Sequence, residues 1–408
     1  MNSIEIFTMA LGLQQPWSVT EVEFVENNDS DQKELHLWID FEKGHKFVIG
    51  ESEARAAYDT IDKTWRHLDF FQHHCYLHAR VPRIRVSDNP VKMVEVPWAR
   101  QDSGFTLLFE AYAMLLIEKE MPVNSVAHTT KVTAPRIWRI FSYWVKRAVD
   151  KIDMSEVRSM TSKRKGHDNV TLFVDLDKRC AIYVTEGRGA ETFKEFKEEL
   201  VRRNGKVENI SAISMDMSPS FISGATTYFP EAAVIFDKFH IHKALSESFD
   251  TVRKQEHKCA KLLKGHRFTL LYKKSNLSDA RKTELETLLQ TYPIIGKAYG
   301  FRESFMDIFE ERPQTREAVD RIEKWREKVL EASIAPMTKF VAMVRAHMFG
   351  IKTMFEHQNV NNGILEGLNS LVQLAKKRAR GYANAENFKY MIYFCVGKLK
   401  LDYPHDSL

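Results

Sequence analysis

The residues best suited to chemistry lie near the C-terminal end of the sequence, in residues 362–369. One carboxylate, Glu366, stands there between two glycines and two asparagines. The helical run that follows ends in four cations, Lys376, Lys377, Arg378 and Arg380. Because divalent metal ions need acidic oxygen ligands and a phosphate backbone attracts cations, the pattern favours a metal-dependent enzyme that acts on nucleic acid. The structural alternative is a helix start followed by a solvated basic face.

Two further acids follow short apolar runs that predict β-strands. Residues 210–216 end in Asp216, and residues 232–237 end in Asp237. Ligands of α/β sheets gather at the carboxyl ends of strands. A pair of divalent ions about 4 Å apart needs several carboxylates to catalyse in-line phosphoryl displacement. A single acid at a strand end is more often a turn or cap residue, but Asp216, Asp237 and Glu366 together could hold such ions if folding gathers them.

The bulk composition indicates a soluble protein of two or three domains. The chain has 408 residues, 44% hydrophobic and 28% charged, and its net charge of +5 permits nucleic-acid binding without demanding it. Four well-separated cysteines fit a reducing cytosol and argue against a disulfide framework. The apolar run at residues 105–117 contains Glu110 and is too short to span a bilayer, and we find no signal peptide. We therefore expect a cytoplasmic protein.

Residues 1–100 predict a β-rich, irregular module. Residues 19–24 and 34–41 alternate apolar and polar side chains, as half-buried strands do, and a turn-forming stretch separates them. Residues 65–85 are crowded with histidine and arginine. A histidine cluster could bind a metal, although such histidines more often pack or face solvent.

Residues 101–150 predict a helix-turn-helix. Residues 105–119 form a long apolar-periodic helix, a short second helix starts at Pro122, and Thr133 caps a third helix with Pro135 in its first turn. The third helix carries the candidate DNA-binding side chains Arg136, Arg139, Lys146 and Arg147. The alternative is an ordinary helical hairpin.

Residues 170–240 alternate strand and helix, which predicts a mixed α/β sheet. A strand hairpin at residues 170–185 is followed by a helix at 191–203, a strand, a helix at 219–228 and another strand. Residues 240–356 are almost entirely helical, with acid–base pairs three or four positions apart. We interpret this helical stretch as an insertion that separates the sheet from Glu366.

The sequence resembles the DDE transposases of bacterial insertion sequences, in particular the ISL-three family. The matching stretches occur in the family's order along nearly the whole chain, at residues 63–68, 75–83, 96–100, 103–110, 173–177, 215–221, 236–240 and 362–369. The resemblance implies an α/β RNase H-like catalytic core interrupted by an all-α insertion, preceded by a small β-rich module and a helix-turn-helix. The implied domains are a degenerate zinc-binding module at 1–100, the helix-turn-helix at 101–150, the core at 151–240 and 357–408, and the insertion at 241–356.

The resemblance also assigns roles to individual residues. By motif match, Asp216 is the second catalytic acid and Glu366 the third, and both would hold Mg²⁺ or Mn²⁺. Asp237 and His240 fall on the family's D-x-x-H motif, where a supporting role is expected and not direct metal ligation. The implied partners are double-stranded DNA, both the terminal inverted repeats of the element and the target, and further copies of the chain on that DNA. The implied location is the bacterial nucleoid.

Two departures from the family pattern stand out. The first catalytic aspartate normally precedes a Gly-His pair, but here Ser159 and Met160 occupy the acidic positions. Four nearby acids remain as possible substitutes, and their spacing selects none of them: Asp153, Glu156, Asp175 and Asp177. In the N-terminal module only Cys75 remains of the expected zinc-binding cysteines, so we expect no structural zinc.

The leading hypothesis is a transposase that binds element ends and catalyses metal-dependent DNA cleavage and strand transfer. The alternative is a catalytically impaired DNA-binding remnant or regulator, because loss of one member of a cooperating catalytic set costs several orders of magnitude in rate. A third and weaker hypothesis is a stand-alone RNase H-like nuclease, which the helix-turn-helix argues against.

Overall fold

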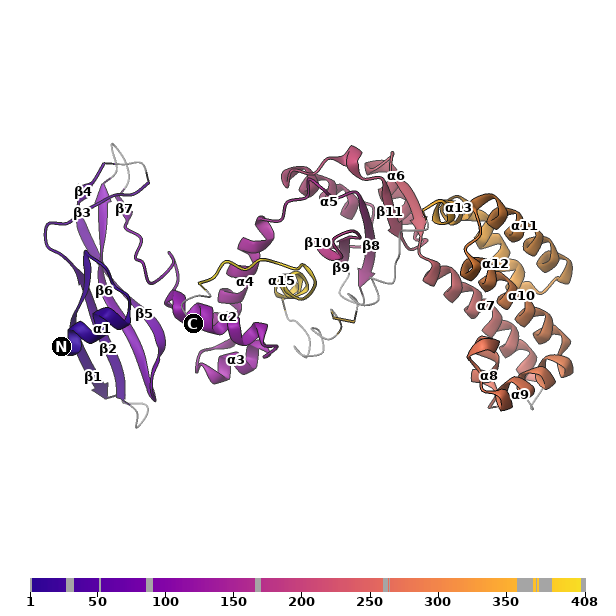
Figure 1. The fold of residues 1–408 in the computed structure, drawn as a ribbon, viewed down its shortest axis with the longest axis horizontal. Coiled ribbons are helices and arrows are strands. Elements are labelled where there is room, and N and C mark those ends of the chain that lie inside the picture. The colour runs from indigo at the N-terminus through magenta and orange to yellow at the C-terminus, as the bar shows by residue number, and fades with distance from the viewer. Residues whose placement is uncertain are drawn as a thin grey trace. The chain divides into compact units, whose positions relative to one another are not determined.

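The computed structural model describes residues 2–26, 33–50, 53–85, 91–165, 170–259, 263, 265–357, 370–371, 373 and 384–404 (Figure 1). The chain forms two compact units, Met1–Ala148 with Lys400–Leu408, and Val149–Leu399. Within the described residues, every helix is too short or too polar to cross a membrane.

The first unit begins with a β-sheet whose strands run in the order β1-β2-β6-β5, with β7 paired to β6. Its elements are α1 (Ser3–Ala10), β1 (Trp17–Glu26), β2 (Lys33–Phe41), β5 (Asp59–Phe70), β6 (His73–Arg85) and β7 (Val91–Met93). A separate two-stranded ribbon pairs β3 (Lys46–Phe47) with β4 (Arg55–Ala56). The two strands predicted at residues 19–24 and 34–41 are confirmed as β1 and β2. The histidine- and arginine-rich stretch forms most of β5 and β6, which the sequence analysis did not predict as strands.

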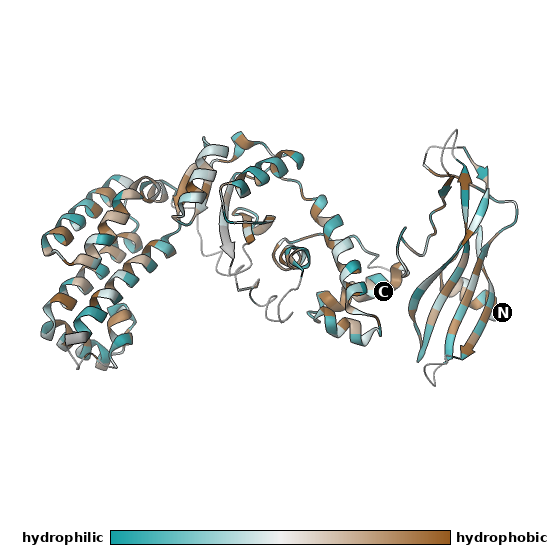
Figure 2. Ribbon diagram, turned by 180° about the vertical axis from the view of Figure 1, so that it is seen from behind, coloured by the Kyte–Doolittle hydropathy of each residue, from teal (hydrophilic) through white to brown (hydrophobic). Residues whose placement is uncertain are grey.

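The side chains on one face of this sheet form a hydrophobic core. Leu37 of β2 pairs with Leu77 of β6, and both are fully buried. Hydrophobic and hydrophilic residues alternate along these strands (Figure 2), as expected when successive side chains point to opposite faces. On the other face, His36 and His78 stack with ring centroids 5.0 Å apart and a nitrogen–nitrogen distance of 2.7 Å. These two histidines therefore pack against each other, in line with the structural alternative for the histidine-rich stretch.

Three helices follow the sheet with the layout of a helix-turn-helix: α2 (Leu107–Glu118), α3 (Val123–Thr129) and α4 (Ala134–Asp150). The Thr106 hydroxyl caps α2 by accepting a hydrogen bond from the Phe109 N–H. The centre of the bundle is the fully buried carboxylate of Glu110. It accepts hydrogen bonds from Arg100 Nε at 2.9 Å, from the Ser103 hydroxyl and from Trp144 Nε1 at 2.9 Å. A buried charge is tolerated only when it is paired in this way.

The second unit contains a mixed sheet with strand order β10-β9-β8-β11-β12. The strands are β8 (Ser159–Lys165), β9 (Val170–Asp175), β10 (Cys180–Glu186), β11 (Ala212–Met215) and β12 (Ala233–Phe236). The first three form an antiparallel meander, and β11 and β12 then extend the sheet parallel to β8. Two helices, α5 (Glu191–Arg202) and α6 (Pro219–Tyr228), connect the later strands.

The core of this sheet lies under α5 and α6. Phe173 of β9 stacks on Phe196 of α5 with centroids 4.4 Å apart. Met160, Ile213 and Val234 are register neighbours on β8, β11 and β12, and all three belong to the same buried cluster. These side chains define the face of the sheet that packs against α5 and α6, and the residues between them in sequence face the other way.

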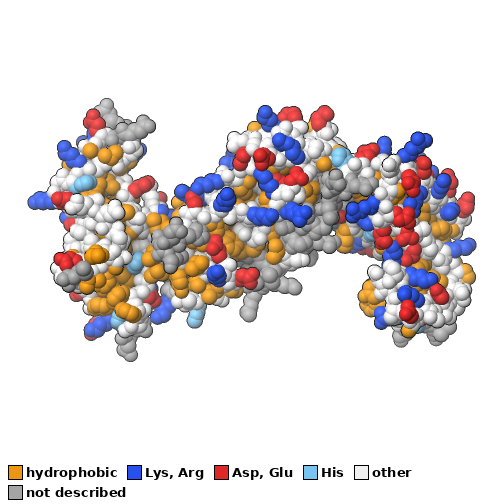
Figure 3. Space-filling view, viewed as in Figure 1, with side chains coloured by type: hydrophobic (Ala, Val, Ile, Leu, Met, Phe, Trp, Pro, Cys, Tyr) orange, Lys and Arg blue, Asp and Glu red, His pale blue; other side chains and the backbone are white. Residues whose placement is uncertain are grey.

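A run of helices follows β12: α7 (Lys238–Cys259), α8 (Arg267–Leu271), α9 (Asp279–Thr291), α10 (Pro293–Glu311), α11 (Thr315–Ala332), α12 (Ala335–Ala346) and α13 (Met348–Glu356). Acidic and basic side chains are interspersed over their exposed surface (Figure 3). Arg302, only 1% exposed, donates hydrogen bonds to the carbonyl oxygens of Leu270, Leu271 and Tyr272 at the end of α8. It thus satisfies carbonyls that a helix C-terminus leaves without partners.

The helices α13 and α15 both pack on the mixed sheet. Gly350 of α13 approaches the Phe236 ring of β12 so closely that an added Cβ would lie 2.5 Å from ring atoms. The last helix, α15 (Ala385–Val396), packs on β10, where the Tyr393 hydroxyl accepts a hydrogen bond from the Val184 N–H at 3.0 Å. That bond covers part of the open edge of β10.

Gly350→Ala should therefore destabilise the protein, because the added methyl group overpacks the fully buried ring of Phe236. We expect a loss of about 1–3 kcal/mol in the free energy of unfolding, measured by urea denaturation. Gly300→Ala is the matched control, because Gly300 also lies in a helix but an added Cβ there meets no atom within 4 Å. The control should gain about 0.5–1 kcal/mol from helix propensity. Equal effects of the two substitutions would contradict the close contact between α13 and β12.

Candidate functional site

Asp216 and Asp237 stand next to each other at one end of the mixed sheet. Met215 pairs with Phe236 in the parallel ladder of β11 and β12. The Asp237 N–H donates to the Met215 carbonyl oxygen at 2.9 Å, so the ladder continues by one residue. Asp216 and Asp237 are thus lateral neighbours on strands about 4.8 Å apart. Both lie on the face of the sheet opposite the buried cluster that contains Met215 and Phe236.

Each of these carboxylates also stabilises the backbone that follows it. Asp216 Oδ1 accepts a hydrogen bond from the Ser218 N–H at 3.0 Å, in the turn before α6. Asp237 Oδ1 accepts one from the Phe239 N–H at 2.9 Å, which makes Asp237 the N-cap of α7. His240, one turn further, has its Nε2 4.0 Å from Asp237 Oδ2. His240 therefore lies beside Asp237.

The strand next to β11 carries no acid. β8 consists of Ser159, Met160, Thr161, Ser162, Lys163, Arg164 and Lys165. In the parallel ladder Ser159 pairs with Ala212, four residues before Asp216. At roughly 3.3 Å per residue, Ser159 lies about 13 Å short of Asp216 along the strand. Its hydroxyl donates instead to Asp177 Oδ2 at 3.1 Å.

The four acids that could have replaced the missing aspartate lie at the other end of the sheet. β9 runs antiparallel to β8, and its last residue, Asp175, pairs with Met160 near the start of β8. Asp177 follows it, and Asp153 and Glu156 precede β8. Asp175 is fully buried, and its Oδ1 accepts hydrogen bonds from the Asp177 and Lys178 N–H groups. Burial raises the pKa of the Asp175 carboxyl above its ordinary value. The register therefore places all four acids away from Asp216.

Glu366 and the four cations Lys376, Lys377, Arg378 and Arg380 lie outside the described residues. Their flanks are described on both sides. α13, which precedes Glu366, packs on β12, the strand that leads into Asp237. α15, which follows the four cations, packs on β10 at the opposite edge of the same sheet.

The potential ligand atoms at Asp216 are oxygens, the ligand type that hard cations such as Mg²⁺ prefer. They are the oxygens of Asp216 and Asp237 and the hydroxyl of Thr161, which is buried and has no hydrogen-bond partner among the described residues. Within the described residues, however, no three histidine, cysteine, aspartate or glutamate side chains are gathered as metal ligands. The described part of this site is therefore at least one acid short of a complete metal centre.

The predicted DNA-binding side chains of α4 fall into two pairs. Arg136 stacks over the Phe105 ring at 4.2 Å, and burial together with the neighbouring Arg139 lowers its pKa. Arg147 forms an ion pair with Asp402 at 2.8 Å. Arg139 and Lys146 are exposed. Arg147 is exposed as well, but of these three exposed cations it is the one with an acidic partner among the described residues.

Sequence reasoning did not identify Glu110 as the centre of the helical bundle. A carboxylate inside an apolar helix was the available signal, because such a residue must be paired if it is buried. Arg100 is its charged partner, and the Arg100 guanidinium also lies 3.9 Å from the centroid of the Tyr143 ring. These contacts connect the segment before α2 with α4.

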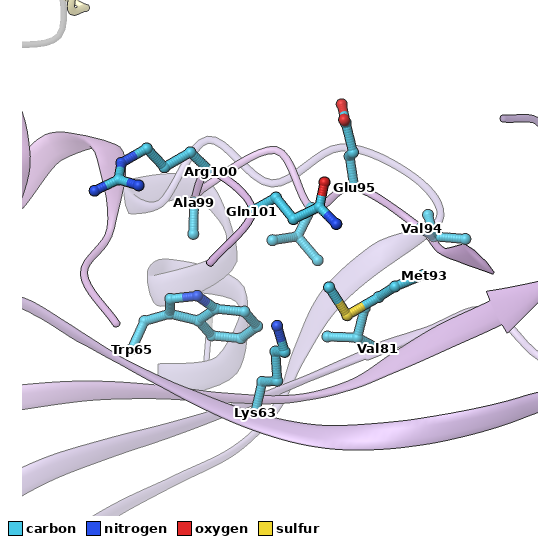
Figure 4. Close-up of a pocket in the computed structure, with 10 residues that line it drawn as sticks. Lys63, Trp65, Val81, Met93, Val94, Glu95, Ala99, Arg100 and Gln101 are labelled. Carbon is cyan, nitrogen blue, oxygen red and sulfur yellow. The ribbon is translucent and has the colours of Figure 1, made fainter. Parts of the chain in front are cut away.

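A small pocket lies in the first unit, between the sheet and the segment after β7 (Figure 4). Lys63 extends between Trp65 and Met93, and Arg100 and Gln101 lie on the opposite side. The neighbouring Val94 and Ala99 belong to the buried core of this sheet. None of the candidate catalytic acids lines the pocket. It lies where the chain passes from the sheet to the helices.

In comparisons with known proteins, one family model matches residues in each of the two units. The family model described as a transposase matches residues 160–392, more than half of the 408 residues. A second model, the helix-turn-helix domain of transposase family ISL3, matches residues 94–145. A helix-turn-helix domain joined to a transposase domain defines the class, and the chain belongs to the ISL3 family of transposases.

Curated relatives match along nearly their whole length. The chain is 25% identical over 393 residues to the transposase for insertion sequence element IS1001 of Bordetella parapertussis, which covers 91% of this chain and 94% of the relative. It is 21% identical over 427 residues to the transposase for insertion sequence element IS1557 of Mycobacterium tuberculosis, covering 95% and 94%.

Proposed function

We propose that this chain is a DDE-type transposase that binds the ends of a bacterial insertion sequence and cuts and joins DNA with the help of divalent metal ions. The observation that carries the proposal is Asp216 at the end of β11, inside the residues that match the transposase family. The strand order, an antiparallel meander followed by two parallel strands, supports an RNase H-like core. The helices from α7 to α13 are then an insertion between β12 and Glu366.

Within this proposal, Asp216 and Glu366 hold Mg²⁺ or Mn²⁺. The ions would supply charge stabilisation to the phosphate and lower the pKa of an attacking water. Asp237 fixes the start of α7 as its N-cap and keeps His240 beside its own carboxylate. The basic residues of the last segment neutralise the DNA backbone: Lys376, Lys377, Arg378 and Arg380.

DNA recognition is proposed to belong to α3 and α4. In a helix-turn-helix the second helix of the motif enters the major groove, and its N-terminal part reads base edges. Arg139 lies in that part of α4, and Lys146 lies two turns further along, where it would contact phosphate. Arg136 and Arg147 would first have to leave Phe105 and Asp402, so we assign them smaller contributions.

A second candidate function is favoured by the composition of β8. A chain with no acid on that strand could bind element ends without cutting them, and would then act as a regulator of active copies. Both functions need the same DNA recognition, so a cleavage assay is required to separate them.

Arg139→Ala should weaken binding to a duplex that carries one terminal inverted repeat of the element. We expect a loss of several-fold to about tenfold in affinity and a salt dependence that is shallower by about one unit, because one cation–DNA contact is removed. Fluorescence anisotropy over a series of salt concentrations measures both. Arg281→Ala, an exposed cation of α9, is the control and should change neither. Equal losses in the two variants would contradict recognition by α4.

Glu366→Ala should abolish Mg²⁺-dependent cleavage of the same duplex while leaving its binding intact. Removal of one metal-binding acid typically costs about a thousandfold or more in rate. The assay is denaturing electrophoresis of end-labelled DNA, with Mg²⁺ omitted as a further control. Cleavage that survives Glu366→Ala would reject this residue as a catalytic acid. Tight binding by the unchanged chain with no cleavage would favour the regulator.

A further inference from the structure

The register of β8 identifies which of its residues with described side chains lies nearest to Asp216 on the same face of the sheet. Thr161 pairs with Ser214 of β11, two residues before Asp216. Residues two apart on a strand share a face, so Thr161, Ser214 and Asp216 all point to the same side of the sheet. With strands about 4.8 Å apart and a rise of about 3.3 Å per residue, the Cα atoms of Thr161 and Asp216 are about 8 Å apart. A carboxylate at position 161 could therefore reach a metal ion held by Asp216, whereas one at position 159 could not.

The Thr161 side chain has an unusual environment for a hydroxyl. The residue is only 1% exposed, and its Oγ1 has no hydrogen-bond partner among the described residues. A buried polar group left in this state is unfavourable unless a ligand satisfies it. Ser162 is also buried and has no partner in the described part of the chain, but the alternation of the strand turns it to the opposite face, with Met160. Thr161 is thus a buried hydroxyl on the Asp216 face of β8 that no described residue satisfies.

We propose that Thr161 stands at the place of the missing first acid and offers a neutral oxygen to the metal ion that Asp216 binds. The inference rests on the proposed function, because it concerns the same metal site. A hydroxyl can ligate a hard cation, but it contributes no negative charge. The centre of this chain therefore binds divalent ions more weakly than a site with three acids. The motif match instead places the missing acid at Ser159. The two assignments therefore predict that different positions, 161 or 159, will strengthen Mn²⁺ binding when aspartate is introduced there.

Manganese binding without DNA distinguishes the two positions. We expect Thr161→Asp to tighten Mn²⁺ binding by about ten- to a hundredfold, the change that one well-placed group makes to metal affinity. Ser159→Asp should leave the affinity unchanged. Electron paramagnetic resonance of free Mn²⁺, titrated into the full chain, measures both. Thr161→Asn, which has the shape of aspartate but no charge, is the matched control and should not tighten binding.

The Thr161→Asp variant places a carboxylate in a buried position, so its thermal unfolding should be followed with and without Mn²⁺. If the site is correct, Mn²⁺ raises the unfolding temperature of Thr161→Asp more than that of Thr161→Asn, because a bound ion stabilises only the folded state. Failure of Thr161→Asp to fold in saturating Mn²⁺, or tighter binding by Ser159→Asp, would overturn the inference.

Asp216→Asn separates this inference from the proposed function. If Asp216→Asn weakens Mn²⁺ binding but Thr161→Asp does not strengthen it, the metal site stands and the role of Thr161 is rejected. If Asp216→Asn has no effect on Mn²⁺ binding, the metal site of the proposed function fails as well.

Discussion

The parallel register of β8, β11 and β12 is the constraint on which the site depends. Met160, Ile213 and Val234 are neighbours across these strands and are buried together under α5 and α6. A slip by one residue would turn every buried side chain of a strand to the opposite face, so this core holds the register firmly. The same register sets Asp216 beside Asp237 at one end of the sheet and Asp175 at the other. Packing of one face against α5 and α6 thus decides which acids can meet on the other face.

Acidic side chains serve two different physical roles in this chain. Glu110 is fully buried and accepts hydrogen bonds from Arg100, Ser103 and Trp144, so it joins the segment before α2 to α4. Asp216 and Asp237 instead lie at a strand end, where one oxygen of each shapes the following turn or helix start. The buried carboxylate of Glu110 stabilises the fold. Asp216 and Asp237 also stabilise the backbone, but they lie at the carboxyl ends of strands, where α/β proteins bind ligands. The identity of the residue does not separate these roles, but burial and partners do.

Much of the fold could be predicted from local patterns, and the exceptions have physical reasons. Strands β1 and β2, helices α2 to α4 and the strand-end positions of Asp216 and Asp237 follow from periodicity and cap residues. β8 could not be found in this way, because its residues are mostly polar and show no apolar alternation. The distance of Asp175 and Asp177 from Asp216 also required the structure. β9 runs antiparallel to β8 and β11, so its carboxyl end lies at the opposite end of the strands from that of β11. Glu366 was found by motif alone and lies outside the described residues.

The most direct test of this account is an experimental structure of the chain bound to element-end DNA with a divalent ion. The account predicts that Asp216 and Glu366 ligate the same ion or an ion pair about 4 Å apart. It also predicts that the Thr161 side chain contacts that ion, whereas Ser159 does not. A structure with Glu366 on the far side of the sheet from Asp216, or with Ser159 beside the ion, would contradict it.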